Sequence, residues 1–370
     1  MLNILVTGSS GFIGKNLCAN LRLNNKINVL EINKESTQKE FNENIEKADI
    51  IFHLAGVNRP TNNDEFTTGN FHLTKTIVNV LQKSKKKTPI VLTSSIQAEQ
   101  ANEYGKSKKN AEDELIKWSE GSGSKIYIYR LPNVFGKWSK PNYNSVIATF
   151  CYNTANDLPI VIDAPEKELS LVYIDDVITE FMKIVNNELP LDKVFYEIPR
   201  IFKISLQEIA DKIISFGNIS STLLAPNFSS AFDRFLYATY TSFLKTDKFS
   251  YKLDTKSDDR GWLAEFIKSK EFGQIFVSST RPGYTRGNHW HNTKIEKFLV
   301  VSGKGLIKLR QFETHKIFSY EVSSEILEVV DMPAGYIHSI TNSSDQDMVT
   351  IFWTDELFNS KKPDTNFQEV

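Results

Sequence analysis

The chain has 370 residues, more than one hydrophobic core normally supports, so two domains are expected. Hydrophobic residues make up 40% and charged residues 24% of the sequence, which is typical of a folded protein and excludes a disordered or fibrous one. The formal net charge of -1 leaves no basic surplus, so neither nucleic acid nor an anionic membrane is expected as a partner.

The cysteines and the N-terminal segment indicate where the protein works. Cys18 and Cys151 are far apart and belong to no C-x-x-C pair, so neither a disulfide nor a thiolate metal site is expected. The N-terminal residues run directly into a strand pattern without a signal-like segment, and no later segment approaches the length of a membrane span. We therefore expect a cytoplasmic protein.

The first half alternates short apolar runs with longer helical stretches. This rhythm predicts an α/β domain with a doubly wound parallel sheet of the Rossmann type. The predicted strands lie at residues 3–6, 28–32, 50–53, 90–92 and 125–129.

The second half follows a different pattern. Closely spaced runs rich in Val, Ile, Phe and Thr predict an antiparallel all-β sandwich or barrel, with strands at residues 274–278, 297–301, 306–309, 327–330 and 348–353. Residues 205–216 and 230–243 are predicted to be helical, and the polar stretch 245–250 is the expected linker. We place the domain boundary near Thr246, giving domains at residues 1–246 and 247–370.

A glycine-rich segment directly follows the first predicted strand. Gly8, Gly11 and Gly14 have G-x-x-G-x-x-G spacing and precede a helical pattern. Glycine allows a tight turn and close approach of the backbone to a pyrophosphate, which helix N-terminal N–H groups can bind. The alternative is a turn without a ligand, but the strand-turn-helix context favours a dinucleotide site.

A second group of residues suggests ketone reduction. Tyr104 and Lys108 are four residues apart and share one helix face, and Ser95 follows the predicted strand at 90–92. A tyrosine can protonate a ketone oxygen if a nearby ammonium lowers its pKa, and a serine can hold the carbonyl. An isolated Y-x-x-x-K is more often an ordinary amphipathic helix, but here it accompanies the glycine loop.

Residues 1–243 resemble the extended short-chain dehydrogenase/reductase family, whose members act mostly on nucleotide sugars. The matches are the glycine loop, Y-x-x-x-K, His53 to Gly56, Asn70, Arg130 to Gly136 and Tyr173 to Val177. The resemblance implies that Tyr104 is the general acid, Lys108 its electrostatic partner and ribose ligand, and Ser95, or alternatively Ser94, the carbonyl-holding serine. It further implies a cofactor site at Gly8, Gly11, Phe12, Ile13, Gly14, Leu54, Ala55, Gly56 and Lys108, and a substrate contact at Asn133.

The end of the second predicted strand bears on the choice of cofactor. An acidic residue there would bind the ribose diol of NAD, whereas a cation would accept the extra phosphate of NADP. The segment offers both Glu31 and Lys34. If Glu31 lies inside the strand and Lys34 at its tip, NADPH is favoured.

Three of the six histidines fall in one compact pattern in the second half. His289 and His291 would face the same side of a strand, and Glu296 and His338 could come from neighbouring strands. Three imidazoles and a carboxylate suit zinc, although nickel, iron or manganese fit the same ligand types. The alternative is a set of histidines satisfied inside a barrel without metal.

This spacing resembles the first cupin motif, and residues 333–342 resemble the second, with Leu327 in place of its leading glycine. The segment around Arg260 and Trp262 is similar to the entry segment of cupin epimerases that act on 4-keto-6-deoxy nucleotide sugars. The resemblance implies that Arg260 binds substrate phosphate, a task that its planar guanidinium suits. The alternative is a β-turn with a surface ion pair.

The combination of these halves resembles the bifunctional bacterial capsule enzymes on the route to UDP-N-acetyl-L-fucosamine. It implies that the cupin epimerises C3 of UDP-2-acetamido-2,6-dideoxy-4-hexulose and that the reductase then reduces C4 with NADPH, giving UDP-2-acetamido-2,6-dideoxy-L-talose. It also implies a homodimer. The alternatives are a reductase with a structural, dimerising cupin, and a redox-sensing protein that binds the nucleotide without turnover.

Overall fold

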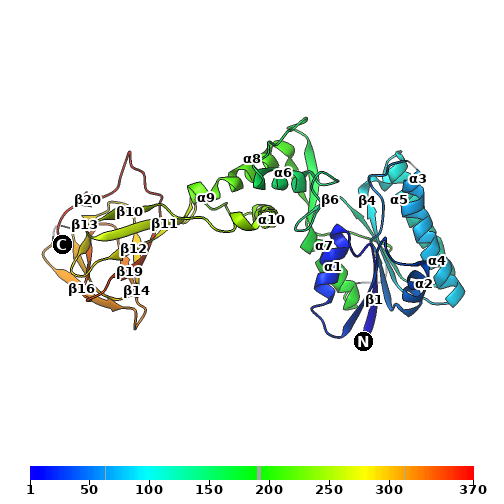
Figure 1. Ribbon diagram of the computed structural model, residues 1–370, viewed down its shortest axis with the longest axis horizontal. Helices are drawn as coiled ribbons and strands as arrows, with labels where there is room; N and C mark the ends of the chain where they lie inside the picture. Colours follow the sequence, from blue (N-terminus) through cyan, green and yellow to red (C-terminus); the bar gives the residue numbers. More distant parts are fainter. Residues whose placement is uncertain (63, 190–192, 313) are drawn as a thin grey trace. The chain divides into compact units, whose positions relative to one another are not determined.

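The structure, a computed structural model, describes residues 1–62, 64–189, 193–312 and 314–370 (Figure 1). The chain divides into two compact units, one of residues 1–213 with 235–245 and one of residues 214–234 with 246–370. The division into functional domains at residues 1–246 and 247–370 stays a prediction. Within the described residues, no helix combines the length and the apolar character that crossing a membrane requires.

The first unit is built on a six-stranded sheet in the order β2-β1-β3-β4-β5-β8, in which every neighbouring pair is parallel. Five of the strands match the apolar runs that the sequence predicts, so the doubly wound fold is confirmed. The strands are β1 (Leu2–Thr7), β2 (Ile27–Ile32), β3 (Ile50–His53), β4 (Ile90–Ser95), β5 (Ile126–Leu131) and β8 (Phe195–Tyr196).

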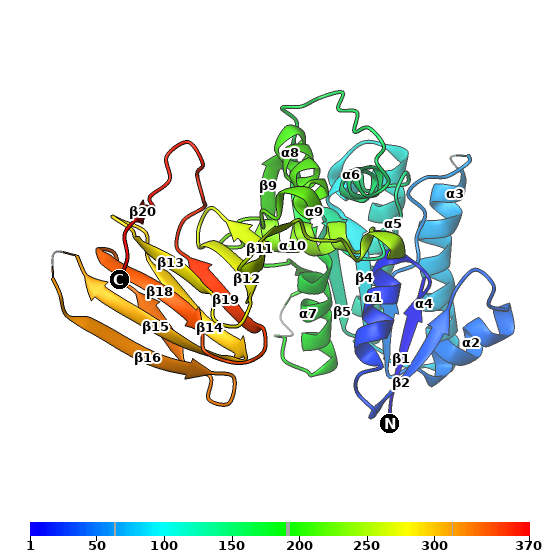
Figure 2. The same ribbon diagram turned by 60° about the vertical axis from the view of Figure 1, so that its left-hand side comes forward.

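Helices cover both faces of this sheet (Figures 1 and 2). On one face lie α1 (Phe12–Leu21) and α7 (Ile174–Val185), and on the other lie α2 (Gln38–Lys47), α4 (Leu73–Ser84) and α5 (Glu103–Ser122). The α2–α4–α5 side buries an apolar cluster that includes Leu5, Ile51, Ile77, Leu81 and Leu115, each without solvent exposure. Burial of such side chains stabilises the fold by roughly 1.5–3 kcal/mol each.

Shorter elements complete the connections. A three-stranded sheet in the order β6-β7-β9 contains β6 (Asn133–Phe135), β7 (Glu168–Tyr173) and β9 (Phe202–Ser205). The helical elements are α3 (Asp64–Phe66), the π-helix η1 (Thr67–His72), η2 (Ile96–Glu99), α6 (Val146–Ala155), α8 (Leu206–Gly217), α9 (Ile219–Thr222), α10 (Ala231–Thr241) and η3 (Thr246–Lys248). Both helices expected between the two halves, α8 and α10, are therefore present.

The second unit contains two antiparallel sheets, in the orders β10-β11-β12-β19-β14-β17 and β16-β15-β18-β13-β20. This arrangement is consistent with the predicted cupin-like all-β fold. The strands are β10 (Thr255–Asp258), β11 (Gly261–Ser269), β12 (Gly273–Thr280), β13 (Thr285–Trp290), β14 (Glu296–Ser302), β15 (Lys304–Gln311), β16 (Ile317–Ser323), β17 (Val329–Met332), β18 (Tyr336–Asn342), β19 (Met348–Thr354) and β20 (Asn366–Phe367).

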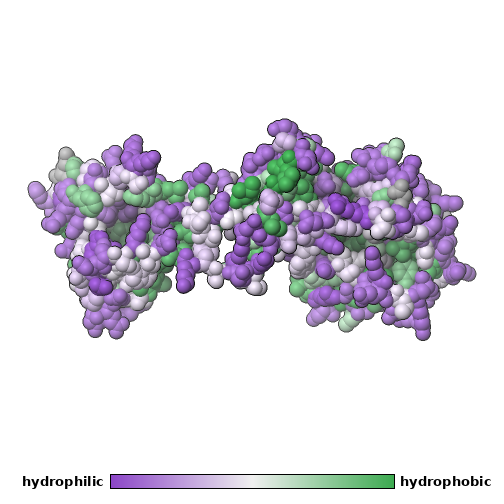
Figure 3. Space-filling model, turned by 45° about the horizontal axis from the view of Figure 1, so that its top comes forward, coloured by the Kyte–Doolittle hydropathy of each residue, from purple (hydrophilic) through white to green (hydrophobic). Residues whose placement is uncertain are grey.

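The core of this unit forms where the two sheets face one another. Phe298 and Phe352 from one sheet and Ile307 and Ile340 from the other belong to a single buried cluster. Alternation of apolar and polar residues along the strands directs these side chains inwards. Hydrophilic side chains cover most of the visible surface of each unit in Figure 3, as expected when the apolar residues are inside.

Candidate functional site

The glycine segment turns at the carboxyl end of β1, which pairs with β2 on one side and β3 on the other. The carboxyl ends of strands at such a reversal of chain order form the usual ligand site of an open α/β sheet. Gly8 has φ +68°, and a Cβ there would lie 2.9 Å from the Cα of Ala55. A Cβ on Gly14 would lie 2.2 Å from the Gly8 carbonyl oxygen. Both positions therefore require glycine.

Gly11 precedes α1, whose first turn has no side-chain cap. Among the described residues, a Cβ on Gly11 would come within 4 Å of the Gly8 oxygen alone, at 3.1 Å. Its other side is open space, as close approach of a pyrophosphate requires. The backbone N–H groups at the start of α1 have no acceptor within the helix and suit an anion there.

A pocket of ≈ 730 Å³ begins at this loop. Most of the predicted reductase residues line it: Gly8, Gly11, Phe12, Ile13, Gly14, Leu54, Gly56, Ser94, Ser95, Tyr104, Lys108 and Asn133. Ala55 lies beneath the loop instead, where its N–H donates to the Thr7 hydroxyl at 3.2 Å. The volume is within the range of small-molecule and cofactor sites.

Tyr104, Lys108 and Ser95 meet in this pocket. Tyr104 and Lys108 are one turn apart in the first half of α5, and Ser95 is the last residue of β4. Burial raises the pKa of Tyr104, against a hydrogen bond from Ser95 that lowers it. Burial lowers the pKa of Lys108 to about 8, and its ammonium donates to the Thr93 carbonyl at 2.8 Å. Burial therefore opposes the expected effect of Lys108, which is to lower the Tyr104 pKa, and that effect stays a prediction.

Ser94, the alternative serine, has its hydroxyl engaged by a buried carboxylate. Its hydroxyl donates to Glu112 at 2.5 Å, and the same fully buried carboxylate accepts two bonds from Arg130, at 3.0 and 2.7 Å. Ser94 and Arg130 are register partners on β4 and β5. Glu112 is one helical turn beyond Lys108 and acts to raise the Lys108 pKa. Sequence reasoning missed Glu112, although counting four residues along the same helix face would have found it.

Asn70 holds the loop that follows β3. Its side-chain oxygen accepts from the Val57 N–H at 2.9 Å, and its amide donates to the Val57 carbonyl at 2.9 Å and to Ser107 at 3.0 Å. A Cβ on Gly56 would lie 2.7 Å from the Asn70 oxygen and 3.3 Å from the Lys108 nitrogen. A larger side chain at residue 56 would therefore displace the side chains of Asn70 and Lys108.

Glu31 and Lys34 differ in whether their side chains are free to contact a cofactor. Glu31 lies inside β2 and pairs with Arg22. Lys34 is exposed in the turn that follows the strand, and the choice between NADH and NADPH stays a prediction. Lys34 does not line the pocket itself.

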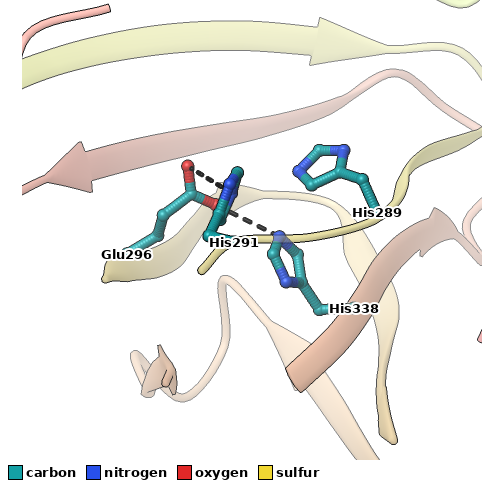
Figure 4. Close-up of side chains that lie close together, drawn as sticks. All are labelled: His289, His291, Glu296 and His338. Atoms are coloured by element: carbon teal, nitrogen blue, oxygen red, sulfur yellow. Dashed lines mark ion pairs between the residues drawn. The ribbon is translucent and has the colours of Figure 1, made fainter. Parts of the chain in front are cut away.

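The four predicted metal ligands lie close together in the second unit (Figure 4). His289 on β13 is the register partner of His338 on β18, and Glu296 begins β14 in the facing sheet. The candidate ligand atoms of all four residues lie within 4.8 Å of one another. His291 is not on the strand as expected, because β13 ends at Trp290 after a register shift between Gly287 and His289.

The hydrogen bonds of the histidines fit a metal. The Nδ1 atoms of His291 and His338 donate to the carbonyls of Asp364 and Tyr336, which leaves both Nε2 lone pairs facing Glu296, 3.4 and 3.2 Å from its oxygens. Neither Nε2 atom has a hydrogen-bond partner among the described residues. Lone pairs and a carboxylate repel one another unless a cation lies between them, so the donor set suits a divalent ion.

The charge states agree with this interpretation. Burial, with the neighbouring His338, lowers the pKa of His289 to about 3, so its imidazole is neutral. Burial acts to raise the pKa of Glu296, but the adjacent His291 and His338 outweigh it and hold that pKa well below its ordinary value. A neutral imidazole at His289 and an ionised carboxylate at Glu296 are the forms that bind metal.

Arg260, predicted to bind a substrate phosphate, follows β10 in an exposed turn. Its guanidinium donates to Asp258 at 3.0 and 2.5 Å, and its N–H donates to the same carboxylate at 2.9 Å. The turn with a surface ion pair is therefore present, and a phosphate would have to compete with Asp258.

Comparisons with known proteins cover the whole chain. The NAD dependent epimerase/dehydratase family matches residues 4–196, and the polysaccharide biosynthesis C-terminal domain matches residues 256–366. A Pseudomonas aeruginosa protein named UDP-2-acetamido-2,6-beta-L-arabino-hexul-4-ose reductase is 43% identical over 364 residues, 98% of each chain. The crystal structure of the capsular polysaccharide assembling protein CapF from Staphylococcus aureus is 45% identical and covers 100% of both chains, with a TM-score of 0.94. CapF with the inhibitor 3-isopropenyl-tropolone is 41% identical, also covers 100% of both chains and has a TM-score of 0.88.

Proposed function

Since the chain belongs to the NAD dependent epimerase/dehydratase family and, over its full length, to the group that contains CapF, we propose that it is a bifunctional nucleotide-sugar enzyme. Its cupin-like domain epimerises C3 of UDP-2-acetamido-2,6-dideoxy-4-hexulose. Its first domain then reduces the C4 ketone to give UDP-2-acetamido-2,6-dideoxy-L-talose, on the route to UDP-N-acetyl-L-fucosamine for a polysaccharide.

The reductase activity is supported by one observation: the glycine loop lines the same pocket as Tyr104, Lys108 and Ser95. A bound reduced nicotinamide supplies hydride. Ser95 would hold the C4 carbonyl, and the Tyr104 hydroxyl would give its proton to the oxygen, so that the ketone becomes an alcohol. The Lys108 ammonium would stabilise the tyrosinate that this transfer leaves.

NADPH is the proposed form of the cofactor. The exposed Lys34 beyond β2 supports it, because a lysine can pair with the additional phosphate. Pairing of Glu31 with Arg22 supports it too, since that carboxylate is already engaged and the strand tip presents a cation.

The metal centre consists of His289, His291, Glu296 and His338, with zinc as the proposed ion. The inward-facing Nε2 atoms and the ionised carboxylate support it. The inhibitor named for one relative offers adjacent oxygen donors, a ligand type that divalent ions accept, which also agrees with a metal in that group of proteins. The base that removes the C3 proton stays unassigned.

The order of steps follows from the substrate. A C4 carbonyl acidifies the neighbouring C3 proton, whereas a C4 alcohol does not. Epimerisation therefore precedes reduction, and reduction preserves the new configuration.

A second candidate is a reductase whose cupin is only structural and dimerising. It is favoured by the metal cluster, because four protein ligands can form a closed structural site. Exposed apolar side chains at the start of the edge strand β17 and in the segment just before it, with Ile326, Leu327 and Val329 at 77%, 66% and 55% exposure, would suit the homodimer that either candidate includes.

The test separates the two activities. The 4-keto substrate is incubated with the enzyme in deuterated water without NADPH, and C3 is followed by NMR. Deuterium incorporation at C3 supports the epimerase. If metal-free enzyme incorporates no deuterium, the metal is required for the epimerisation. A chain that oxidises NADPH with this substrate but introduces no label would leave only the second candidate.

A further inference from the structure

The segment 364–369, which we call the strap, runs along the metal cluster although it is distant in sequence. Its strand β20 pairs with β13 in the register His289 with Phe367 and Trp290 with Asn366. The Gln368 N–H donates to the Asn288 carbonyl at 2.9 Å, and the Glu369 carbonyl accepts from Arg310 at 2.8 Å. The strap is therefore attached to the strand that carries one ligand.

The Asp364 carboxylate holds the loop that joins two other ligands. Its oxygens accept from three successive backbone N–H groups, those of Asn292 at 2.9 Å, Thr293 at 2.8 Å and Lys294 at 3.0 Å. The Thr293 hydroxyl adds a fourth bond at 3.1 Å. These donors lie between His291 and Glu296, so one side chain fixes the backbone connecting them.

The backbone of Asp364 also sets the ring of His291. Its carbonyl accepts from the His291 Nδ1, so the proton resides on Nδ1 and the lone pair on Nε2 points towards Glu296. A hydrogen bond at the far nitrogen of a histidine is what orients such a ligand and sets its tautomer. Asp364 therefore acts on the His291 ring through its carbonyl and on the 292–294 loop through its carboxylate.

We propose that the strap is a positioning element of the metal centre, with Asp364 holding the ligand loop and the His291 tautomer ready for the ion. This inference rests on the metal centre proposed above. Asp364 touches none of the reacting atoms; it acts through His291 and the backbone up to Glu296.

The test compares full-length Asp364→Asn with Asp345→Asn as the matched control. Asp345 is an exposed aspartate of the same unit, in the turn that follows β18, and the bonds from residues 292–294 go to Asp364 and not to it. Asparagine offers one acceptor oxygen where the carboxylate offers two, and its amide N–H₂ would face backbone donors. Zinc dissociation constants are measured by competition with a chelator. We expect Asp364→Asn to weaken zinc binding by about 10- to 100-fold and Asp345→Asn to leave it unchanged.

Hydrogen exchange of the 292–294 amides in metal-free protein supplies a second readout. We expect it to become faster in Asp364→Asn and to stay at the parental rate in Asp345→Asn, because only the first variant removes the acceptor. Parental zinc affinity in Asp364→Asn, or unchanged amide exchange, overturns the role of the strap. A parental chain that binds no divalent ion overturns the metal centre itself, and with it the inference.

Discussion

Replacing Glu112 with glutamine removes a buried negative charge beside the reductase pocket, where Glu112 bonds to the pocket residue Ser94. Glu112 is fully buried, accepts two bonds from Arg130 and one from Ser94, and is one turn from Lys108 on α5. Glutamine has nearly the same shape but offers a single acceptor oxygen and no charge. The change therefore tests the electrostatics with little change in packing.

Two magnitudes follow. Breaking a buried ion pair costs about 3–5 kcal/mol of stability. The Arg130 side chain is 24% exposed and also pairs with Glu99, so we expect the free energy of unfolding to fall by about 2 kcal/mol. Charges on neighbouring helical turns, at roughly 6–10 Å and an effective dielectric constant of about 20, interact by roughly 1.7–2.8 kcal/mol. Loss of that attraction lowers the pKa of Lys108 further.

The sign of the pH effect follows from the charged form that catalysis needs. Burial lowers the pKa of Lys108 to about 8, so its ammonium, and with it the reductase activity, is lost as pH rises through about 8. Burial raises the pKa of Tyr104, so tyrosine ionisation lies higher still. Glu112 favours the ammonium, and Glu112→Gln must therefore move the alkaline fall in kcat/KM to lower pH.

The assay is NADPH oxidation with the 4-keto substrate from pH 6 to about pH 9.5, beside urea unfolding of the same proteins. Glu120→Gln is the control, because Glu120 is exposed on the same helix. A purely structural Glu112 would lower stability without moving the pH profile. An unmoved alkaline limb in Glu112→Gln would refute the coupling to Lys108.

The other predictions address single positions. Tyr104→Phe should lower reduction by about 10²- to 10⁴-fold, because the proton donor is lost; NADPH oxidation at the parental rate would contradict the mechanism. Gly14→Ala should destabilise the first unit by about 1–3 kcal/mol and weaken dinucleotide binding, since its Cβ would lie 2.2 Å from the Gly8 oxygen. Gly121→Ala, with nothing within 4 Å of its Cβ, is the control for urea unfolding and titration, and equal losses in both would refute the steric argument. Lys34→Ala should raise the KM for NADPH by roughly tenfold and leave that for NADH unchanged, because one phosphate contact is lost; an unchanged ratio of the two constants would remove Lys34 from the site.

Local signals explain what the sequence predicts well. The glycine loop is recognised from the spacing of a few consecutive residues, and the Tyr104–Lys108 pair from the helical period, which puts residues four apart on one face. Apolar runs with turn residues between them mark five strands of the parallel sheet and β12, β14, β15, β17 and β19 of the second unit, which is enough to predict the fold class; the polar strands β10 and β13 carry no such signal. Convergence of the four metal ligands also follows from motif spacing, since they occupy the strands of one sandwich and the loops between them.

Tertiary contacts explain what the sequence does not predict. His291 lies one residue beyond the end of β13, and within that strand Asn288 has φ +57° and the ladder shifts register, features that strand periodicity cannot reveal. The bonds that the Asp364 carboxylate accepts from the 292–294 loop join segments about seventy residues apart, and no sequence motif predicts them. Pairing of Arg130 with Glu112 depends on the placement of β5 beside β4 and α5.

The ring configuration of the product tests the bifunctional account most directly. The purified chain is given the 4-keto substrate and NADPH in deuterated water, and the product is analysed by mass spectrometry and NMR. The account predicts a C4 alcohol with the L-talo configuration and deuterium at C3. A reduced sugar that retains its original C3 configuration and C3 proton would contradict it.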